Sequence, residues 1–128
     1  MIYLDSSVVL ARVFAEPQSP TAVFWRQSFV SSRLLEYEVV NRVLARSANA
    51  KQLRQAEQLL RGFSLLDLSR QTLARALQSF PTPVRTLDGL HLATMDFLRA
   101  QNQPIELATY DRRLAIAATA MGFALAPL

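Results

Sequence analysis

Short apolar runs alternate with helical segments along the whole chain, and this alternation is the feature that most restricts its fold. The runs at residues 2–4, 30–32, 63–68, 105–109 and 123–126 are predicted strands. Helical spacing and helix-end signals predict helices at residues 7–14, 22–29, 33–48, 52–61, 69–80, 85–99 and 111–121. Strands that alternate with helices are typical of parallel sheets, so the pattern predicts an α/β domain with a mostly parallel central sheet.

Length and composition predict one domain that spans residues 1–128. A chain of 128 residues with 51% hydrophobic content can bury a core without disulfides or a structural metal. It has no cysteine, which excludes a thiolate metal site and favours an intracellular location. The N-terminus lacks the pattern of a signal peptide, and no run approaches the roughly 18 apolar residues of a membrane span. We therefore expect a cytoplasmic protein with no membrane partner.

The basic side chains are almost all arginine. The formal net charge is +4, and of the fourteen basic residues only Lys51 is a lysine. Arginine suits bidentate contact with phosphate, which favours a polyanionic partner such as RNA. The arginines are spread along the chain, so a second interpretation, that they reflect the base composition of the gene and solvate the surface, stays open.

Two acids stand where strands give way to helices. Asp5 follows the strand at residues 2–4, and Asp111 follows the strand at residues 105–109. In an open parallel sheet, ligands bind in the crevice beyond the carboxyl ends of the strands. We expect both carboxylates at this edge, although each can also be explained as a local helix cap.

Two further acids lie within apolar helical sequence. Glu38 interrupts the apolar surface of its helix, where it could pair with Arg42 or serve a site, and helical periodicity alone does not separate it from Glu36. Asp88 falls in the first turn of a later helix, where the helix dipole favours a carboxylate. His91 follows one turn later among apolar residues, which favours a packing or hydrogen-bonding role over that of a general base.

Four segments together resemble the PIN domain, and most closely its VapC-type toxins. They are Tyr3-Leu4-Asp5-Ser6-Ser7, then Leu34-Leu35-Glu36-Tyr37-Glu38-Val39 with Arg42 and Arg46 after it, then Thr86-Leu87-Asp88-Gly89-Leu90-His91-Leu92-Ala93, and finally Thr109-Tyr110-Asp111-Arg112-Arg113-Leu114-Ala115. The third and fourth segments match over eight and seven consecutive residues. The resemblance covers nearly the whole chain.

The resemblance implies a three-layer α/β/α sandwich and a toxin of a toxin–antitoxin pair, namely a metal-dependent endoribonuclease that forms a homodimer and is held inactive by its antitoxin. Asp5, Glu38, Asp88 and Asp111 match the four acids of the family's active site, which favours Glu38 over Glu36. Ser6 or Ser7 and Thr109 match hydroxyl positions that support those acids.

Clustered carboxylates need a cation to neutralise them, and Mg²⁺ or Mn²⁺ takes such oxygen ligands. We expect Asp5 and Asp88 to make the firmest metal contacts, with Glu38 and Asp111 as further ligands, water positioners or a proton acceptor. The alternative function is a PIN-like module that binds RNA or protein without cutting. Four clustered acids argue against it, since a binding module has no use for them.

Overall fold

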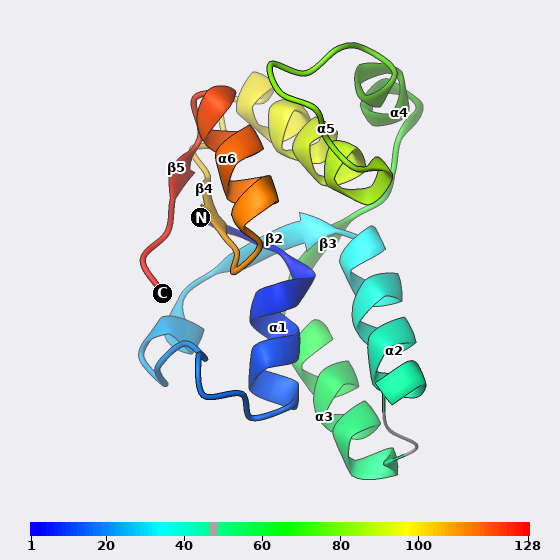
Figure 1. Ribbon diagram of the computed structural model, residues 1–128, viewed down its shortest axis with the longest axis vertical. Helices are drawn as coiled ribbons and strands as arrows, with labels where there is room; N and C mark the ends of the chain where they lie inside the picture. Colours follow the sequence, from blue (N-terminus) through cyan, green and yellow to red (C-terminus); the bar gives the residue numbers. More distant parts are fainter. Residues whose placement is uncertain (47–48) are drawn as a thin grey trace.

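Five parallel strands form the central sheet of the protein (Figure 1). The computed structural model describes residues 1–46 and 49–128. The strands are β1 (Ile2–Leu4), β2 (Phe29–Ser32), β3 (Ser64–Leu66), β4 (Glu106–Ala108) and β5 (Ala124–Leu125), in the spatial order β3-β2-β1-β4-β5. The order runs outward from β1 in both directions, so the sheet has its switch point between β1 and β4.

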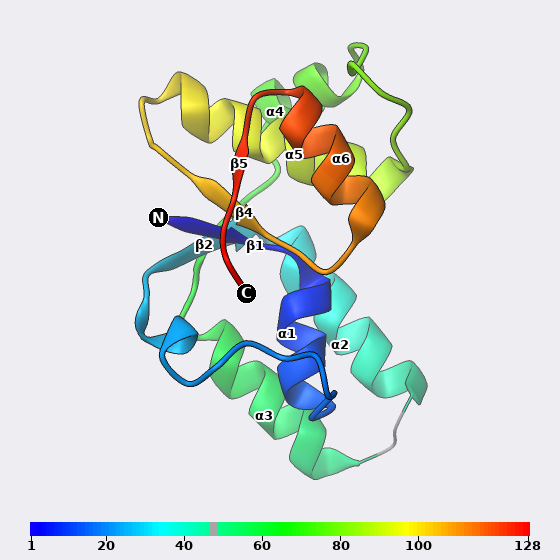
Figure 2. The same ribbon diagram turned by 60° about the vertical axis from the view of Figure 1, so that its left-hand side comes forward.

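Helices cover both faces of the sheet. In the described residues they are α1 (Ser6–Val13), α2 (Leu34–Arg46), α3 (Ala50–Leu60), α4 (Arg70–Ala76), α5 (Thr86–Ala100) and α6 (Arg112–Ala120). Figures 1 and 2 show α1, α2 and α3 on one face and α4, α5 and α6 on the other. The predicted α/β/α sandwich with a parallel sheet is confirmed.

The alternation of side chains along β1 builds two cores. Ile2 and Leu4 pack into the cluster beneath α1, α2 and α3, whereas Tyr3 packs into the cluster beneath α5 and α6. All three residues are buried. This follows from the period of two in a strand, and it places the Tyr3 side chain on the face that α5 covers.

The helix predicted at residues 22–29 is wrong. Only a single 3₁₀ turn forms there, at Phe24–Arg26, and Phe29 belongs to β2, where it pairs with Ile2 of β1. Pairing with the central strand and burial of the aromatic side chains outweigh the local helical pattern. Phe24, Trp25 and Phe29 pack on one another, and Trp25 and Phe29 also pack on Phe63, so this apolar set belongs to the core.

The other helices differ from prediction mainly at their ends. The helix predicted at residues 33–48 corresponds to α2, which ends at Arg46; the predicted end at Ala48 lies outside the described residues. The next helix starts at Ala50, two residues early, with Asn49 as its N-cap. α4 stops at Ala76, ahead of the loop that contains Pro81, and Gly122 ends α6 with a φ of 85°. Within the described chain, no helix combines the length and apolarity that crossing a membrane requires.

Candidate active site

Asp5 and Asp111 flank the switch point of the sheet. Asp5 follows β1 and caps α1, where it accepts the Ser7 N–H at 3.3 Å. Asp111 comes after β4 and caps α6, accepting the N–H groups of Arg113 at 2.8 Å and Leu114 at 3.1 Å. The local interpretation of both acids as caps is therefore confirmed, and the same geometry brings them to one edge of the sheet.

Glu38 and Asp88 reach the same edge from the two helical layers. Asp88 lies in the first turn of α5 and Glu38 in the second turn of α2. Figure 1 shows the first turns of α1, α2, α5 and α6 gathered beside this end of the sheet. Asp5, Glu38, Asp88 and Asp111 all line one cavity of about 270 Å³, together with Ser6, Ser7 and Arg42. The fold thus gathers all four acids predicted from the sequence.

Glu36 lies apart from this cavity. Its carboxylate pairs with Arg33 at 3.4 Å, its side chain is 49% exposed, and it lines a different cavity. The structure therefore separates two residues that helical periodicity leaves equivalent. The alternative pairing of Glu38 with Arg42 is absent from the ion pairs of the described residues, in which Glu38 pairs with His91 instead.

Two hydroxyl groups tie the β1–α1 junction to the β4–α6 junction. Asp5 Oδ2 accepts hydrogen bonds from Ser7 Oγ at 2.5 Å and from Thr109 Oγ1 at 2.8 Å. In turn, Ser7 Oγ accepts the N–H of Tyr110, and Thr109 Oγ1 accepts the N–H of Asp111, each at 2.9 Å. The buried Asp5 carboxylate is therefore held on both sides of the switch point. Of the predicted hydroxyl positions, Ser7 and Thr109 contact Asp5, whereas Ser6 only lines the cavity.

Three of the four carboxylates bind the protein through one oxygen only. Asp5 uses Oδ2, Asp111 uses Oδ1 and Glu38 uses Oε1. The second oxygen of each accepts no hydrogen bond from the described residues, and neither does the Asp88 carboxylate. Asp5, Glu38 and Asp111 are thus each fixed through one oxygen and keep the other available for a cation or a water molecule, and Asp88 has both oxygens available.

His91 joins Glu38 to a buried tyrosine, which sequence reasoning missed. Its Nε2 lies 2.5 Å from Glu38 Oε1, its Nδ1 lies 2.9 Å from Tyr3 Oη, and its side chain is fully buried. Tyr3 Oη accepts the Ser32 N–H at 3.2 Å, so its own hydrogen can be donated to Nδ1. The Nε2–H is then left to donate to Glu38. The hydrogen-bonding role expected for His91 is present, and it holds Glu38 in position.

The acids repel one another. Burial raises the pKa of Asp88, and the nearby charges of Asp111, Asp5 and Glu38 raise it further, with a partial offset from His91. A cation bound among these groups would relieve both the repulsion and the burial cost. The electrostatics of the cavity therefore favour a positively charged ligand.

The donor set fits an open metal site better than a closed one. Among the described residues, no three His, Asp or Glu side chains are near enough to one another to hold an ion unaided. Mg²⁺ is commonly held by one or two carboxylates, with waters and substrate phosphate as its remaining ligands. Free carboxylate oxygens around a small cavity match that requirement.

The Asp88→Asn substitution is expected to stabilise the metal-free protein increasingly as the pH rises. A carboxyl with a raised folded pKa binds its proton more tightly when folded, so the wild type loses stability from about pH 3.9, the ordinary aspartate pKa, up to the raised pKa. The asparagine variant has no carboxyl at this position and does not lose this stability. Urea unfolding in EDTA at a series of pH values measures the difference in unfolding free energy between the two proteins.

Asp96→Asn on the same helix is the matched control. Burial would raise the pKa of Asp96, but hydrogen bonds from Arg75 and Arg99 outweigh burial and lower it. Asp96 therefore contributes stability above its ordinary pKa that is lost as the pH falls, and its asparagine variant should be less stable at neutral pH. Equal losses of stability in both variants would contradict the repulsion at Asp88.

Comparison with known proteins decides the family. The sequence profile described as PIN domain matches residues 2–120, a range that contains all four acids and His91. The chain belongs to the PIN domain family. Within it, the chain is 33% identical to Ribonuclease VapC46 of Mycobacterium tuberculosis (strain ATCC 25618 / H37Rv), covering 96% of this chain and 94% of that protein.

Two further proteins resemble this PIN domain. Ribonuclease VapC47 of Mycobacterium tuberculosis (strain CDC 1551 / Oshkosh) is 29% identical, over 96% of this chain and 93% of that protein. Among solved structures, a chain of a toxin-antitoxin complex from Klebsiella pneumoniae superimposes with a TM-score of 0.61 at 15% identity, and the match covers 94% of both chains. The structural match supports the PIN fold.

Proposed function

We propose that this PIN domain is an endoribonuclease that hydrolyses RNA phosphodiester bonds with Mg²⁺ or Mn²⁺. The observation that carries the proposal is the convergence of Asp5, Glu38, Asp88 and Asp111 on one cavity from four separate segments of the chain. The names of the VapC46 and VapC47 relatives, both ribonucleases, support the reaction and its substrate. RNA as substrate also suits the cytoplasmic location expected from the sequence.

Asp5 and Asp88 would hold the cation most firmly, with Glu38 and Asp111 completing the set. When bound, the cation would supply Lewis-acid chemistry, polarising the phosphate and lowering the pKa of a water. Asp5 is suited to a ligand role because Ser7 and Thr109 fix its Oδ2. Glu38, fixed through Oε1 by His91, is suited to orient the attacking water and accept its proton through Oε2.

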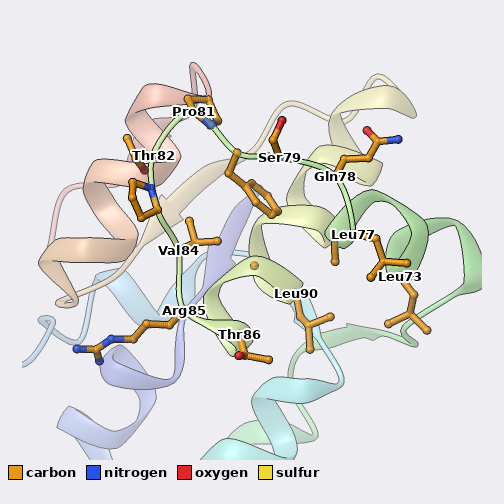
Figure 3. Close-up of a pocket in the computed structure, with 14 residues that line it drawn as sticks. Leu73, Leu77, Gln78, Ser79, Pro81, Thr82, Val84, Arg85, Thr86 and Leu90 are labelled. Carbon is orange, nitrogen blue, oxygen red and sulfur yellow. The ribbon is translucent and has the colours of Figure 1, made fainter.

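We further propose that the protein is the toxin of a toxin–antitoxin pair and acts as a homodimer controlled by an antitoxin protein. The likeness of its fold to a chain of the toxin-antitoxin complex from Klebsiella pneumoniae supports the proposed role in a toxin–antitoxin pair. An apolar cavity of about 700 Å³ between α4, the loop at residues 77–85 and α5 offers a surface for a second copy (Figure 3). Leu77, at its rim, is 90% exposed.

A PIN-like module that binds without cutting is the second candidate. Binding alone does not require four carboxylates in one cavity, where burial and their repulsion raise the pKa of Asp88. The two candidates differ in one measurement, which is the cleavage of RNA by the purified protein.

Removal of divalent metal is expected to stop cleavage. Incubation of the purified protein with total RNA and Mg²⁺ or Mn²⁺ should yield discrete fragments, and excess EDTA should reduce the cleavage rate by at least about 100-fold, because the cation contributes several kcal/mol to the transition state. Re-addition of the metal should restore cleavage. Undiminished cleavage in EDTA would contradict the metal-dependent mechanism, and no cleavage in any condition would favour the binding module.

A further inference from the structure

A second cavity adjoins the acidic cavity and shares Asp88 as a wall. Its volume is about 430 Å³, and it lies between the loop that precedes α5 and the exposed side of α6. Its other lining residues are Thr82, Pro83, Val84, Arg85, Arg113 and Ile116. Because Asp88 lines both cavities, a polymeric ligand bound at the four acids would pass next to this second cavity.

The two arginines of this cavity are unpaired cations. Arg85 and Arg113 are exposed, and neither takes part in an ion pair among the described residues. Arg85 also lines the apolar cavity, and Figure 3 shows its side chain extending to the opposite side of its loop from Leu73 and Leu77. Elsewhere Arg75 and Arg99 both form ion pairs with Asp96. Arg85 and Arg113 therefore place uncompensated positive charge within reach of a ligand.

The positive charge of Arg85 and Arg113 offsets the repulsion between the acidic cavity and a phosphate backbone. Four carboxylates repel the phosphates of an RNA backbone, so the substrate needs cations next to them to approach. Arginine binds phosphate through a planar pair of N–H donors and stays protonated at any physiological pH. Two free arginines at a cavity beside Asp88 are suited to hold the phosphate next to the one that is cut.

The remaining walls suit the rest of a nucleotide. Pro83, Val84 and Ile116 give the cavity an apolar side, and Ile116 is 53% exposed although it is a large aliphatic residue. A ribose or a base can pack against such a surface while its phosphate contacts the arginines. Apolar and cationic walls in one cavity indicate a nucleotide rather than an inorganic anion alone.

We propose that this second cavity is a subsite for the nucleotide that neighbours the scissile phosphate, with Arg85 and Arg113 on its phosphate and Ile116 against its ribose or base. The inference rests on the proposed ribonuclease function, because it names how that site holds its substrate. It adds binding residues that lie outside the set of four acids.

The salt dependence of RNA binding tests the subsite. The probe is a short fluorescein-labelled single-stranded RNA of mixed sequence, titrated with protein that carries Asp5→Asn in Mg²⁺ over a series of KCl concentrations, with anisotropy as the signal. Each phosphate that loses its cationic contacts should reduce the slope of log affinity against log salt by about 0.7, so Arg85→Gln with Arg113→Gln, which act on one phosphate, should reduce it by about 0.7. Lysine at both positions should restore most of the slope.

Two matched variants define the controls. Arg54→Gln removes the same charge from the exposed side of α3, on the other face of the sheet, and should leave the slope unchanged. Ile116→Ser should weaken binding with no change in slope, because it removes an apolar contact and no charge. A double arginine variant with the slope of Arg54→Gln would overturn the subsite, as would a protein that does not bind this RNA.

Failure of the subsite and failure of the proposed function give different results. Anisotropy measures binding without cleavage, so an unchanged slope overturns the subsite even if the wild type cuts RNA. A reduced slope together with no cleavage by the wild type would overturn the proposed function and support the subsite as an RNA-binding surface. Circular dichroism of each variant confirms that these exposed substitutions leave the fold intact.

Discussion

Protein with the substitution Asp5→Asn is expected to remain folded and to cleave RNA about 100- to 1000-fold more slowly than the wild type. The side-chain oxygen of asparagine can still accept the hydrogen bonds from Ser7 and Thr109 that Asp5 Oδ2 accepts. An amide group then replaces the free carboxylate oxygen, and the negative charge is lost. Loss of about 3–4 kcal/mol of electrostatic stabilisation corresponds to that fall in rate. Initial rates on labelled RNA measure it.

Asp67→Asn is the matched control for this substitution. Asp67 follows β3 as Asp5 follows β1, but its carboxylate is exposed and pairs with Arg33 outside the acidic cavity. We expect its asparagine variant to cut RNA at the wild-type rate. If Asp5 served only as a helix cap, asparagine would be harmless there too, and an Asp5→Asn protein with wild-type activity would establish that simpler role.

The substitution His91→Leu is expected to reduce both stability and turnover. Loss of the imidazole leaves the buried Tyr3 hydroxyl without the acceptor of its hydrogen, which costs about 1–3 kcal/mol of unfolding free energy. Glu38 loses the donor that fixes its Oε1, and loss of such an outer partner typically reduces activity by about 10- to 100-fold. The reduction should appear in kcat with little change in KM, because His91 is buried and does not reach the substrate.

A double-mutant cycle separates positioning from simple destabilisation. In a Glu38→Gln background, the further change His91→Leu should reduce stability but cost little additional activity, since the group that His91 positions is already altered. Thr72→Val on α4, which removes the part-buried hydrogen bond that Ser69 donates to the buried Thr72, should destabilise the protein and leave kcat unchanged. Additive losses of activity in the cycle would show that His91 does not act through Glu38.

The positions of Asp5 and Asp111 were predictable from the sequence because a general rule covers them. Both follow apolar strands, and the carboxyl ends of parallel strands share one edge of a sheet. Strand length and alternation with helices were enough to expect this edge. The structure adds that β1 and β4 are neighbours, which depends on the order of the strands rather than on local pattern.

Glu38 was harder to predict because its decisive contact comes from a distant segment. Periodicity describes one helix at a time, and on α2 it leaves Glu36 and Glu38 equivalent. His91, which pairs with Glu38 and contacts Tyr3, lies on another helix 53 residues away. One signal was available, since His91 stands three residues after Asp88 and therefore shares its face of α5.

The mistaken helix at residues 22–29 shows a second limit of local reasoning. The helix predicted there would have contained Phe24, Trp25 and Phe29. Instead Phe29 enters the sheet beside β1, and the rings gather around Phe63, which comes from a much later part of the chain. Tertiary burial decided the local structure here, and no periodicity within the segment could reveal it.

The response of the melting temperature to metal tests most directly whether the four acids bind a cation. A ligand that binds only the folded state stabilises it, so Mg²⁺ or Mn²⁺ should raise the melting temperature of the wild type. We predict no such rise for Asp5→Asn, measured by differential scanning calorimetry against the Asp67→Asn control. Equal shifts in the wild type and in Asp5→Asn would contradict the assignment of Asp5 as a metal ligand.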